Sequence, residues 1–404
     1  MTSAITNVQV FDGERVLGER TVVLDGGLIT AIGGPLPSAA EVFDGGGGTL
    51  LPGLIDSHVH TDPDGLRDAL AFGVTTELEL QGRWSARKRR EIAVRDDLAD
   101  LRTSGMGVTR KGGHPSEYVT SSGNLLIRYL YRFFPSVQTP EQARRFVAQQ
   151  VANGADYIKV FIEDGSTIGY PGLPVIEQPV LLAAIGAAHD HGKLAIAHVS
   201  TAEGTSRAVA SGVDGLAHLF LDEPTPGLLD AIAASGVFVV PTLVTLSSAF
   251  GNSAAWLAAD PRVRARLSQP WLDSLGRSMN VYPQGSLSSA GASVRALRDA
   301  GVDILAGSDV SEPLPMLGGL AHGASLHHEL QLLVDAGFAP VEALRAATSV
   351  PARRFGLGDR GRIVPGARAD LVLVDGDPTT TISDTLSLRA VWRRGVRRPA
   401  AAPE

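Results

Sequence analysis

The alternation of short apolar runs with amphipathic stretches constrains this chain's fold more than any other feature. Between most of the runs lie stretches with helical periodicity, such as residues 140–154 and 178–192. Repeated strand–helix units are typical of a parallel sheet covered by helices. The runs from residue 53 onward are GLIDSHVH (53–60), GVTTELEL (73–80), MGVTRKGG (106–113), YIKVFI (157–162), LAIAHVS (194–200), GLAHLF (215–220), FVVPTL (238–243) and DILAGSD (303–309). Eight such units predict an α/β fold with a (β/α)8 TIM-type barrel.

Both ends of the chain have a different texture. ITNVQVF (5–11) and the run 19–34 precede the repeats, and the runs 361–378 and 388–396 follow them. They are rich in β-branched residues, and Asp-Gly-Gly at 25–27 is a suitable hairpin turn. We therefore predict two domains. Residues 1–52 plus 356–404 would form a small β-sandwich from both chain termini, and residues 53–355 the barrel.

Composition excludes several classes of partner. The net charge of −7 over 404 residues argues against nucleic-acid binding, which requires a basic face. No apolar run approaches the ~18–20 residues of a membrane span, and no signal peptide is recognisable, so we expect a cytoplasmic protein without membrane contact. The chain contains no cysteine. Any metal must therefore be held by nitrogen and oxygen ligands.

Candidate metal ligands recur at the ends of the predicted strands. His58 and His60 are separated by one residue, so they project to the same side of the first strand. Catalytic residues of barrels sit at the carboxyl ends of the strands. The other strand ends carry Lys159, His198, His218 and Asp309. By contrast, the pair His189 and His191 lies near a helix terminus, where histidines have a structural role.

The chemistry of divalent ions explains this mixture of residues. Zinc, the metal we expect, takes imidazole nitrogen and carboxylate oxygen, although manganese, cobalt or iron would use the same ligands. Two such ions ~3.5–4 Å apart share a bridging hydroxide and need an anionic bridging ligand. A lysine that has reacted with carbon dioxide is a carbamate with two oxygens, whereas arginine stays protonated. Only four of the 36 basic residues are lysines, and one of them, Lys159, lies late in the fourth predicted strand.

The sequence resembles the amidohydrolase superfamily over nearly its whole length. The resemblance lies in LLPGLIDSHVH (50–60), YIKVF (157–161), IAHVS (196–200), His218, GSD (307–309) and the closing segment 361–378. The segment 322–357 resembles prolidase-like and imidazolonepropionase-related enzymes in particular. The resemblance implies two divalent metal ions. His58, His60 and Asp309 would hold one, His198 and His218 the other, and carbamylated Lys159 would bridge them.

Substrate contacts are expected from three further residues. His114 in KGGHPSEY occupies the place of a loop histidine that this branch uses near the substrate, and His322 and Tyr118 are further candidates. Arg110 and Lys111 could bind a substrate carboxylate, although a solvated pair is the simpler interpretation. The segments 113–140 and 244–302 would form loops over the site, although 244–302 could equally be an added helical segment. His327 and His328 read as a helix surface.

We therefore expect a metal-dependent amidohydrolase acting on a small molecule. The bridging hydroxide would attack a carbonyl carbon, and Asp309 would carry its proton to the leaving group. The substrate would be an amide, such as an N-acyl amino acid, a dipeptide, or an aryl amide or carbamate. A lactonase or phosphotriesterase shares this machinery. A deaminase would use one metal without the lysine, and a non-catalytic scaffold would have lost the ligands. Family analogy also indicates association into a homo-oligomer.

Overall fold

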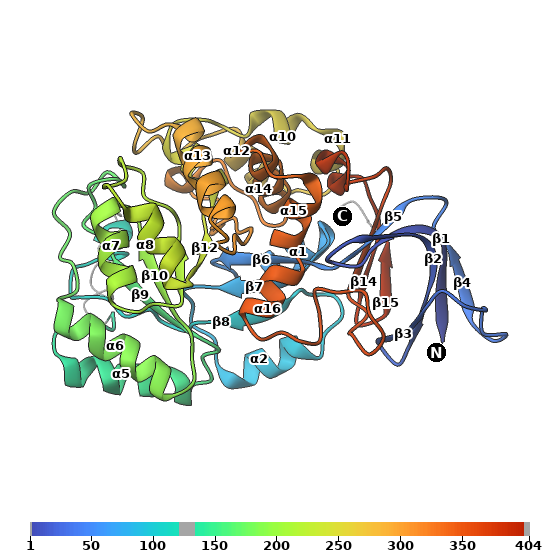
Figure 1. Ribbon diagram of the computed structural model, residues 1–404, viewed down its shortest axis with the longest axis horizontal. Coiled ribbons are helices and arrows are strands. Elements are labelled where there is room, and N and C mark those ends of the chain that lie inside the picture. The colour runs from blue at the N-terminus through green and yellow to red at the C-terminus, as the bar shows by residue number, and fades with distance from the viewer. Residues whose placement is uncertain (1, 121–133, 400–404) are drawn as a thin grey trace.

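The computed structural model describes residues 2–120 and 134–399 and divides visibly into two parts. Strands from both chain termini lie together at one end of the molecule, and parallel strands with surrounding helices form the remainder (Figure 1). Within the described residues, no helix combines the length and the apolar character needed to cross a lipid bilayer.

Strands from the two termini form a single eight-stranded sheet. Its order is β15-β14-β13-β5-β1-β2-β3, with β4 pairing to β1. The two ends of the chain meet where β13 pairs antiparallel with β5. The strands are β1 (Ser3–Phe11), β2 (Val16–Asp25), β3 (Leu28–Ile32), β4 (Glu41–Asp44), β5 (Thr49–Pro52), β13 (Leu371–Val374), β14 (Leu388–Arg393) and β15 (Val396–Pro399).

This terminal sheet curls around its own apolar core. A register shift between Ile5 and Val8 bends β1, so that β4 and β5 pair with successive parts of it. At the far edge, the backbone N–H of Ile29 donates to the carbonyl of Ala367, 2.8 Å away. The enclosed core includes Val22, Leu50, Leu371 and Trp392 among other buried residues. The pairing of both termini predicted from the sequence is thus present.

Two parallel sheets make up the larger part. One has the order β6-β7-β8 and the other β12-β11-β10-β9. Their strands are β6 (Leu54–Val59), β7 (Val74–Glu79), β8 (Asp100–Thr103), β9 (Ile158–Ile162), β10 (Ala195–Val199), β11 (Gly215–Ala217) and β12 (Phe238–Val240). Short segments connect the sheets at both edges. Val108 bridges to Val160 beside β8, and Ile304 bridges to Val239 beside β12.

Two of the eight predicted strands are wrong in detail. The third is β8 at Asp100–Thr103, not 106–113, where only Val108 makes a bridge. Two of its four residues, Asp100 and Arg102, are charged, so the strand contains no apolar run. The eighth run, 303–309, forms no regular strand. Isolated backbone bonds hold it: Val239 N–H to Asp303 O (3.0 Å) on one side and Ser57 N–H to Ala306 O (2.9 Å) on the other.

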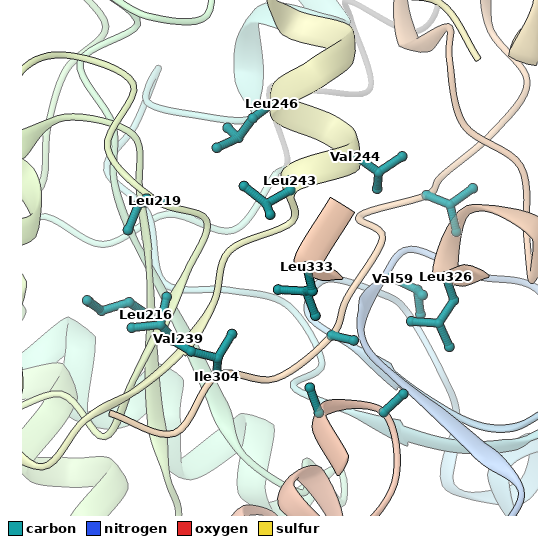
Figure 2. Close-up of a cluster of buried hydrophobic side chains, with 14 of the residues drawn as sticks. Val59, Leu216, Leu219, Val239, Leu243, Val244, Leu246, Ile304, Leu326 and Leu333 are labelled. Carbon is teal, nitrogen blue, oxygen red and sulfur yellow. The ribbon is translucent and has the colours of Figure 1, made fainter. Parts of the chain in front are cut away.

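Alternate residues of the parallel strands face two different apolar clusters. Leu216 lies opposite Val239, and the bridge extends this row to Ile304 (Figure 2). That row packs in the large cluster under the helices, with Leu243 and Leu333 among its members. The next row, including Ala217 and Val240, packs in a smaller inner cluster. Period-two alternation therefore defines an inner and an outer face, as strand geometry requires.

Helices cover the outer face. Asp62, Thr139 and Thr201 begin three of them as N-caps whose side chains accept backbone N–H bonds. The helices are α1 (Pro63–Ala71), α2 (Ala86–Ala93), α3 (Ser116–Thr120), α5 (Pro140–Ala152), α6 (Gln178–Asp190), α7 (Ala202–Ala210), α8 (Leu228–Ser235), α9 (Leu243–Ala249), α10 (Ala255–Ala259), α11 (Pro261–Arg264), α12 (Gln269–Leu275), α13 (Leu287–Asp299), α14 (Ala324–Asp335), α15 (Pro340–Ala346) and α16 (Ser349–Arg354), with 3₁₀ helices η2 (Pro315–Leu317) and η3 (Ile382–Leu386).

The interpretation of His327 and His328 as a helix surface is wrong. Both are buried on α14. His327 is hydrogen-bonded at both ring nitrogens, to Thr385 in η3 and to the carbonyl of Phe72, each at 2.9 Å. His328 packs edge-on against Trp256, with ring centroids 5.1 Å apart. The terminal segment and the 244–302 insertion cover a helix face that would otherwise be exposed.

A buried charge network connects the terminal sheet to the parallel strands. Asp100 in β8 forms ion pairs with Arg360, Arg368 (3.2 Å) and Arg393 in β14 (3.7 Å). Asp370 also pairs with Arg393, at 3.2 Å. Burial alone would raise the pKa of Asp100, but the three guanidinium groups lower it well below its ordinary value. The carboxylate is thus held in its charged form between the two parts of the molecule.

Removing this charge should destabilise the protein substantially. We expect Asp100→Asn to lower the unfolding free energy by about 3–5 kcal/mol, because it leaves buried guanidinium groups without their counter-charge. The control is Asp359→Asn, since Asp359 contacts Arg360 and Arg368 from a half-exposed position and should contribute at most about 1 kcal/mol. Thermal unfolding followed by circular dichroism measures both.

The sign of the pH dependence follows from the lowered pKa. The stabilisation by Asp100 is complete above the unfolded pKa of about 3.9 and is lost as pH falls towards the lower folded value. The difference in Tm between wild type and Asp100→Asn should therefore shrink in strong acid. Equal Tm values for Asp100→Asn and Asp359→Asn at pH 7 would contradict this role of the network.

Candidate active site

Six side chains from four strands, or from residues directly after them, and from the segment 303–310 line one cavity of about 430 Å³. His58 and His60 come from the end of β6, Lys159 from β9 and His198 from β10. The remaining two are His218, directly after β11, and Asp309 in the segment that follows Ile304. The structure thus brings together all six residues that the sequence predicted as metal ligands.

His58, His60 and Asp309 form the tightest group. One carboxylate oxygen of Asp309 lies 3.2 Å from Nε2 of His58 and 3.1 Å from Nε2 of His60. All three ligand atoms lie within 4.8 Å of one another, a spacing that suits a single ion. Nδ1 of His60 faces the carbonyl of Gln81 at 3.3 Å. Because a carbonyl only accepts, Nδ1 carries the proton and Nε2 is free to ligate.

His218 and His198 continue the cluster on its other side. The His218 ring lies 4.6 Å from the rings of both His58 and His198, measured between centroids. Its Nε2 is 3.9 Å from the second oxygen of Asp309. His218 (φ 69°) and Asp309 (φ 55°) both have left-handed backbone conformations, which are unusual outside glycine. At both residues the backbone departs from an extended conformation, and both side chains line the cavity.

Lys159 lies at the base of the cluster. It shares a row with Ile196 of the inner apolar cluster, and its side chain is buried. Its Nζ has no hydrogen-bond partner among the described residues. Burial lowers the pKa of Lys159 to about 7. A buried amine without a hydrogen-bond partner is costly, and the described side chains do not provide such a partner for Lys159.

Burial also determines the charge of the imidazoles. It lowers the pKa values of His58, His198 and His218 well below their ordinary value. The neutral ring is the form that binds metals. Burial would raise the pKa of Asp309, but His218, His60 and Lys159 together lower it. The site therefore combines neutral nitrogen donors with an ionised carboxylate.

Glu163 is a functional residue that the sequence analysis missed. It is buried one residue after β9, with one oxygen 3.0 Å from Nε2 of His198 and also accepting from Ser200. The other oxygen accepts the N–H of Gly165 at 2.6 Å. A carboxylate acceptor places the proton on Nε2 and leaves Nδ1 of His198 as a ligand. The sequence feature that could have identified Glu163 is its position immediately after the predicted fourth strand, 157–162.

Asp56 was also missed, although it lies two residues before His58. It is buried and accepts the backbone N–H groups of His58 (3.2 Å) and Ser308 (3.0 Å) and the hydroxyl of Ser308 (2.6 Å). Burial raises the pKa of Asp56 to about 7. Its contacts fix the backbone of both ligand-bearing segments from below. An acidic residue within an apolar strand, two positions before a candidate ligand, could have drawn attention to it.

His114 and Tyr118 line the cavity as predicted for substrate contacts. His114 stacks on His198, with ring centroids 4.4 Å apart, and its Nδ1 lies 2.5 Å from Glu117. Tyr118 is on α3, with its ring 5.8 Å from that of His114. Of the predicted loop 113–140, residues 121–133 lie outside the described residues.

His322 is placed differently from the prediction. It does not belong to the described lining of the cavity; it is buried, with Nδ1 3.1 Å from Glu77 and its ring edge-on to Trp271. Its expected contact with substrate is therefore not supported, because a side chain of the strand layer already occupies its hydrogen-bonding face. Arg110 and Lys111 are likewise outside this lining, and Arg110 pairs with Glu177 at 3.0 Å.

The predicted loop 244–302 contributes to the site. It contains nearly all of α9 and helices α10 to α13, and several of its residues face the cavity. With residues 311–320 it supplies a mostly apolar wall. The lining residues from these two segments are Thr245, Leu246, Ala249, Met279, Val281, Ser311, Glu312, Leu314, Met316, Leu317 and Leu320.

Comparison with known proteins agrees with this arrangement. The family model described as "Amidohydrolase family" matches residues 49–397. The chain therefore belongs to the amidohydrolase family. By class it is a hydrolase that acts on carbon–nitrogen bonds. The family match covers all six clustered residues and ends within the strands of the terminal sheet.

Individual relatives are distant but nearly full-length. An imidazolonepropionase from Cereibacter sphaeroides is 25% identical over 415 residues, covering 95% of this chain and 93% of its own. The crystal structure of a Xaa-Pro dipeptidase superposes with a TM-score of 0.75 at 23% identity and covers 99% of this chain and 100% of its own. Molinate hydrolase gives a TM-score of 0.77 at 19% identity, covering 99% and 95%. These two structures establish the likeness of fold.

Glu163 provides a test of how the cluster is positioned. We expect Glu163→Ala to weaken retention of metal by the cluster about 10–100-fold, because the His198 imidazole loses the acceptor that fixes its tautomer. Glu163→Gln should lie closer to wild type, since its amide oxygen still accepts. Metal content after dialysis against graded chelator measures the loss. Asp164→Ala, at the exposed neighbouring position, should behave as wild type. Unchanged retention in Glu163→Ala would refute this role.

Proposed function

We propose that the protein is a binuclear metal-dependent hydrolase that cleaves the amide bond of a small substrate. Candidate substrates are an N-acyl amino acid, a dipeptide, or an aryl amide or carbamate. One observation carries the proposal: six side chains from four strands and the segment 303–310 line a single cavity, with ligand nitrogens and a carboxylate facing one another. Family membership supports the class of reaction.

The residues present fit two divalent ions, for which zinc is our first choice. His58, His60 and Asp309 would hold one ion, and His198 and His218 the other. The orphaned amine of buried Lys159 is accounted for if it carries a carbamate derived from carbon dioxide, whose oxygens would serve as anionic ligands. The buried Nδ1 of His58 also has no partner among the described residues, so its ring is held mainly by packing and by what Nε2 contacts.

When bound, two such ions lower the pKa of a shared water enough to make it a nucleophile near neutral pH. Asp309 is placed to accept the proton of that water, since its two oxygens face His60 and His218 from the cavity side. As the water oxygen bonds to the carbonyl carbon, the carbon–nitrogen bond breaks. The same proton then passes from Asp309 to the departing nitrogen. His114 and Tyr118 are positioned to orient the substrate, with Glu117 holding the His114 ring.

We further propose that the two parallel sheets and their bridging segments form one (β/α)8 barrel. Backbone hydrogen bonds at both edges support this, including Val108 N–H to Lys159 O (2.8 Å) and Asp309 N–H to His58 O (2.7 Å). The curled terminal sheet would then be the β-sandwich domain of residues 1–52 and 356–404, beside a barrel domain of 53–355. A small-molecule partner, a cytoplasmic location and self-association remain predictions.

Lys159 distinguishes this proposal from its alternatives. We expect wild type to bind two metal ions per chain and Lys159→Ala to bind at most one and to lose hydrolysis, because the other acidic side chains of the described lining are Asp309, assigned to the first ion, and the exposed Glu312. Elemental analysis and a screen of N-acyl amino acids, dipeptides, aryl amides, carbamates, lactones and phosphotriesters measure both properties. Lys111→Ala, an exposed lysine outside the cavity lining, is the control. A short carboxylic acid should partly rescue Lys159→Ala.

Other results would favour the alternatives. One ion per wild-type chain together with ammonia release would indicate a deaminase. Hydrolysis of lactones or phosphotriesters in preference to every amide would indicate the related esterase activities. Full activity and two ions in Lys159→Ala would contradict the bridging role. A protein that binds no metal and turns over nothing in the screen would be a scaffold.

A further inference from the structure

One side of the cavity is an apolar wall built from three segments that are distant in sequence. Leu246 and Ala249 come from α9, and Leu246, in the middle of this helix, is labelled in Figure 2. Met279 and Val281 come from the segment after α12. The third segment surrounds η2 and contributes Leu314, Met316, Leu317 and Leu320. We call these eight residues the apolar wall.

Hydrogen bonds from one buried residue hold the three segments together. The hydroxyl of Ser248 donates to the carbonyl of Gly318 (2.6 Å) and accepts the N–H of Met279 (2.9 Å). Its backbone carbonyl accepts the N–H of Asn280 at 3.0 Å. Ser248 is 1% exposed. The wall is therefore a fixed element of the site, since each segment is tied to the same point.

The apolar wall is also fixed relative to the metal-ligand cluster. Thr245, one turn before Ala249 on α9, donates its hydroxyl to the carbonyl of Ser308 at 2.8 Å. Ser308 immediately precedes Asp309. A substrate whose carbonyl group lies at Asp309 would thus extend one substituent along α9. The chemistry of this surface determines which substituent it accepts.

Charge on this side is unfavourable to an anion. Among the described lining residues, the groups that can carry positive charge are Lys159 and the five histidines, all in or beside the metal-ligand cluster. The ionisable residue beside the apolar wall is the acidic, exposed Glu312. Arg110 is engaged with Glu177 and with the carbonyl of Val175. A carboxylate lying on the wall would lose hydration without gaining a donor.

We propose that the substrate group bound along the apolar wall is neutral and apolar, such as the aryl or alkyl part of an amide or carbamate. This inference rests on the proposed function and narrows it, because it disfavours dipeptides and N-acyl amino acids. Leu314 and Met316 support it at the mouth, where both are large apolar side chains with more than 40% of their surface exposed (43% and 42%). A bound apolar group would cover them, which removes that surface from water.

Pairs of substrates that differ only by a carboxylate provide the test. Acetanilide is compared with 4-acetamidobenzoate, and N-acetylpyrrolidine with N-acetylproline, using the metal-loaded full-length protein. We expect kcat/KM to be at least about tenfold higher for the neutral member of the pair that is turned over, with most of the difference in KM. Equal values or a preference for the carboxylated member overturns the inference while leaving the proposed function intact. No hydrolysis of any member counts against both.

A substitution at the exposed mouth of the cavity that adds a positive charge beside the apolar wall tests the same proposal. Met316→Lys should raise the ratio of kcat/KM for the carboxylated over the neutral substrate at least about fivefold, because it offers a counter-charge beside the wall. Met316→Leu keeps the apolar surface and should leave the ratio unchanged. Arg128 and Arg132 fall in the segment outside the described residues. A wild-type preference for carboxylates that is lost in Arg128→Met/Arg132→Met would overturn the proposal and identify the anion site.

Discussion

The backbone contact between the end of β6 and the segment 303–310 is the constraint on which the site depends. Asp309 N–H donates to His58 O and His60 N–H donates to Val310 O, each at 2.7 Å. These two bonds place a carboxylate next to two imidazoles that are some 250 residues away in sequence. Gly307 makes the approach feasible, because a Cβ there would lie 3.0 Å from the backbone nitrogen of His58 and 2.5 Å from Val240. Any larger residue would separate the segments.

The polar groups under the cluster make this contact rigid. Asp56 accepts N–H groups from both segments. In the other parallel sheet, Glu163 after β9 holds His198 of the adjacent strand β10. Buried polar groups are costly unless their hydrogen bonds are complete, so each satisfied acceptor also limits how the ligands can move. Within the cluster, Nζ of Lys159 and Nδ1 of His58 are the buried atoms that have no hydrogen-bond partner among the described residues. Hydrogen bonding from the protein is thus incomplete at Lys159, where the proposed carbamate would form.

Much of this site was predictable from the sequence, because strand periodicity and strand ends are local features. His58, His60, His198 and Asp309 could be assigned to one rim since parallel strands end on the same side. Glu163 and Asp56 were missed because an acidic residue beside a strand has no distinctive spacing, and its role depends on which strand lies next to it. His322 was misplaced for the same reason: its partner Glu77 is 245 residues away.

The fold shows the same division between local and distant information. β9, β10 and β12 lie within apolar runs, so their positions were predicted correctly. β8 instead contains Asp100, whose charge is compensated by arginines from the far end of the chain. His327 is buried through Thr385 and Phe72, again distant in sequence. Most patterns within about ten residues were interpreted correctly, since six of the eight apolar runs contain a strand. Burial that depends on long-range partners was not.

The two halves of the cavity have different structural origins, and this has a consequence for function. The ligand half comes from strand ends fixed by the sheets, so its chemistry is tied to the fold. The apolar wall comes from α9, the segment after α12 and the surroundings of η2, which are joined through Ser248 and touch the ligand half at Thr245. Substitutions in the wall can therefore change which substituent is accepted while the ligands stay in place. The strand-end motifs that this chain shares with other amidohydrolases therefore indicate the class of reaction. Substrate preference depends instead on the residues of the apolar wall.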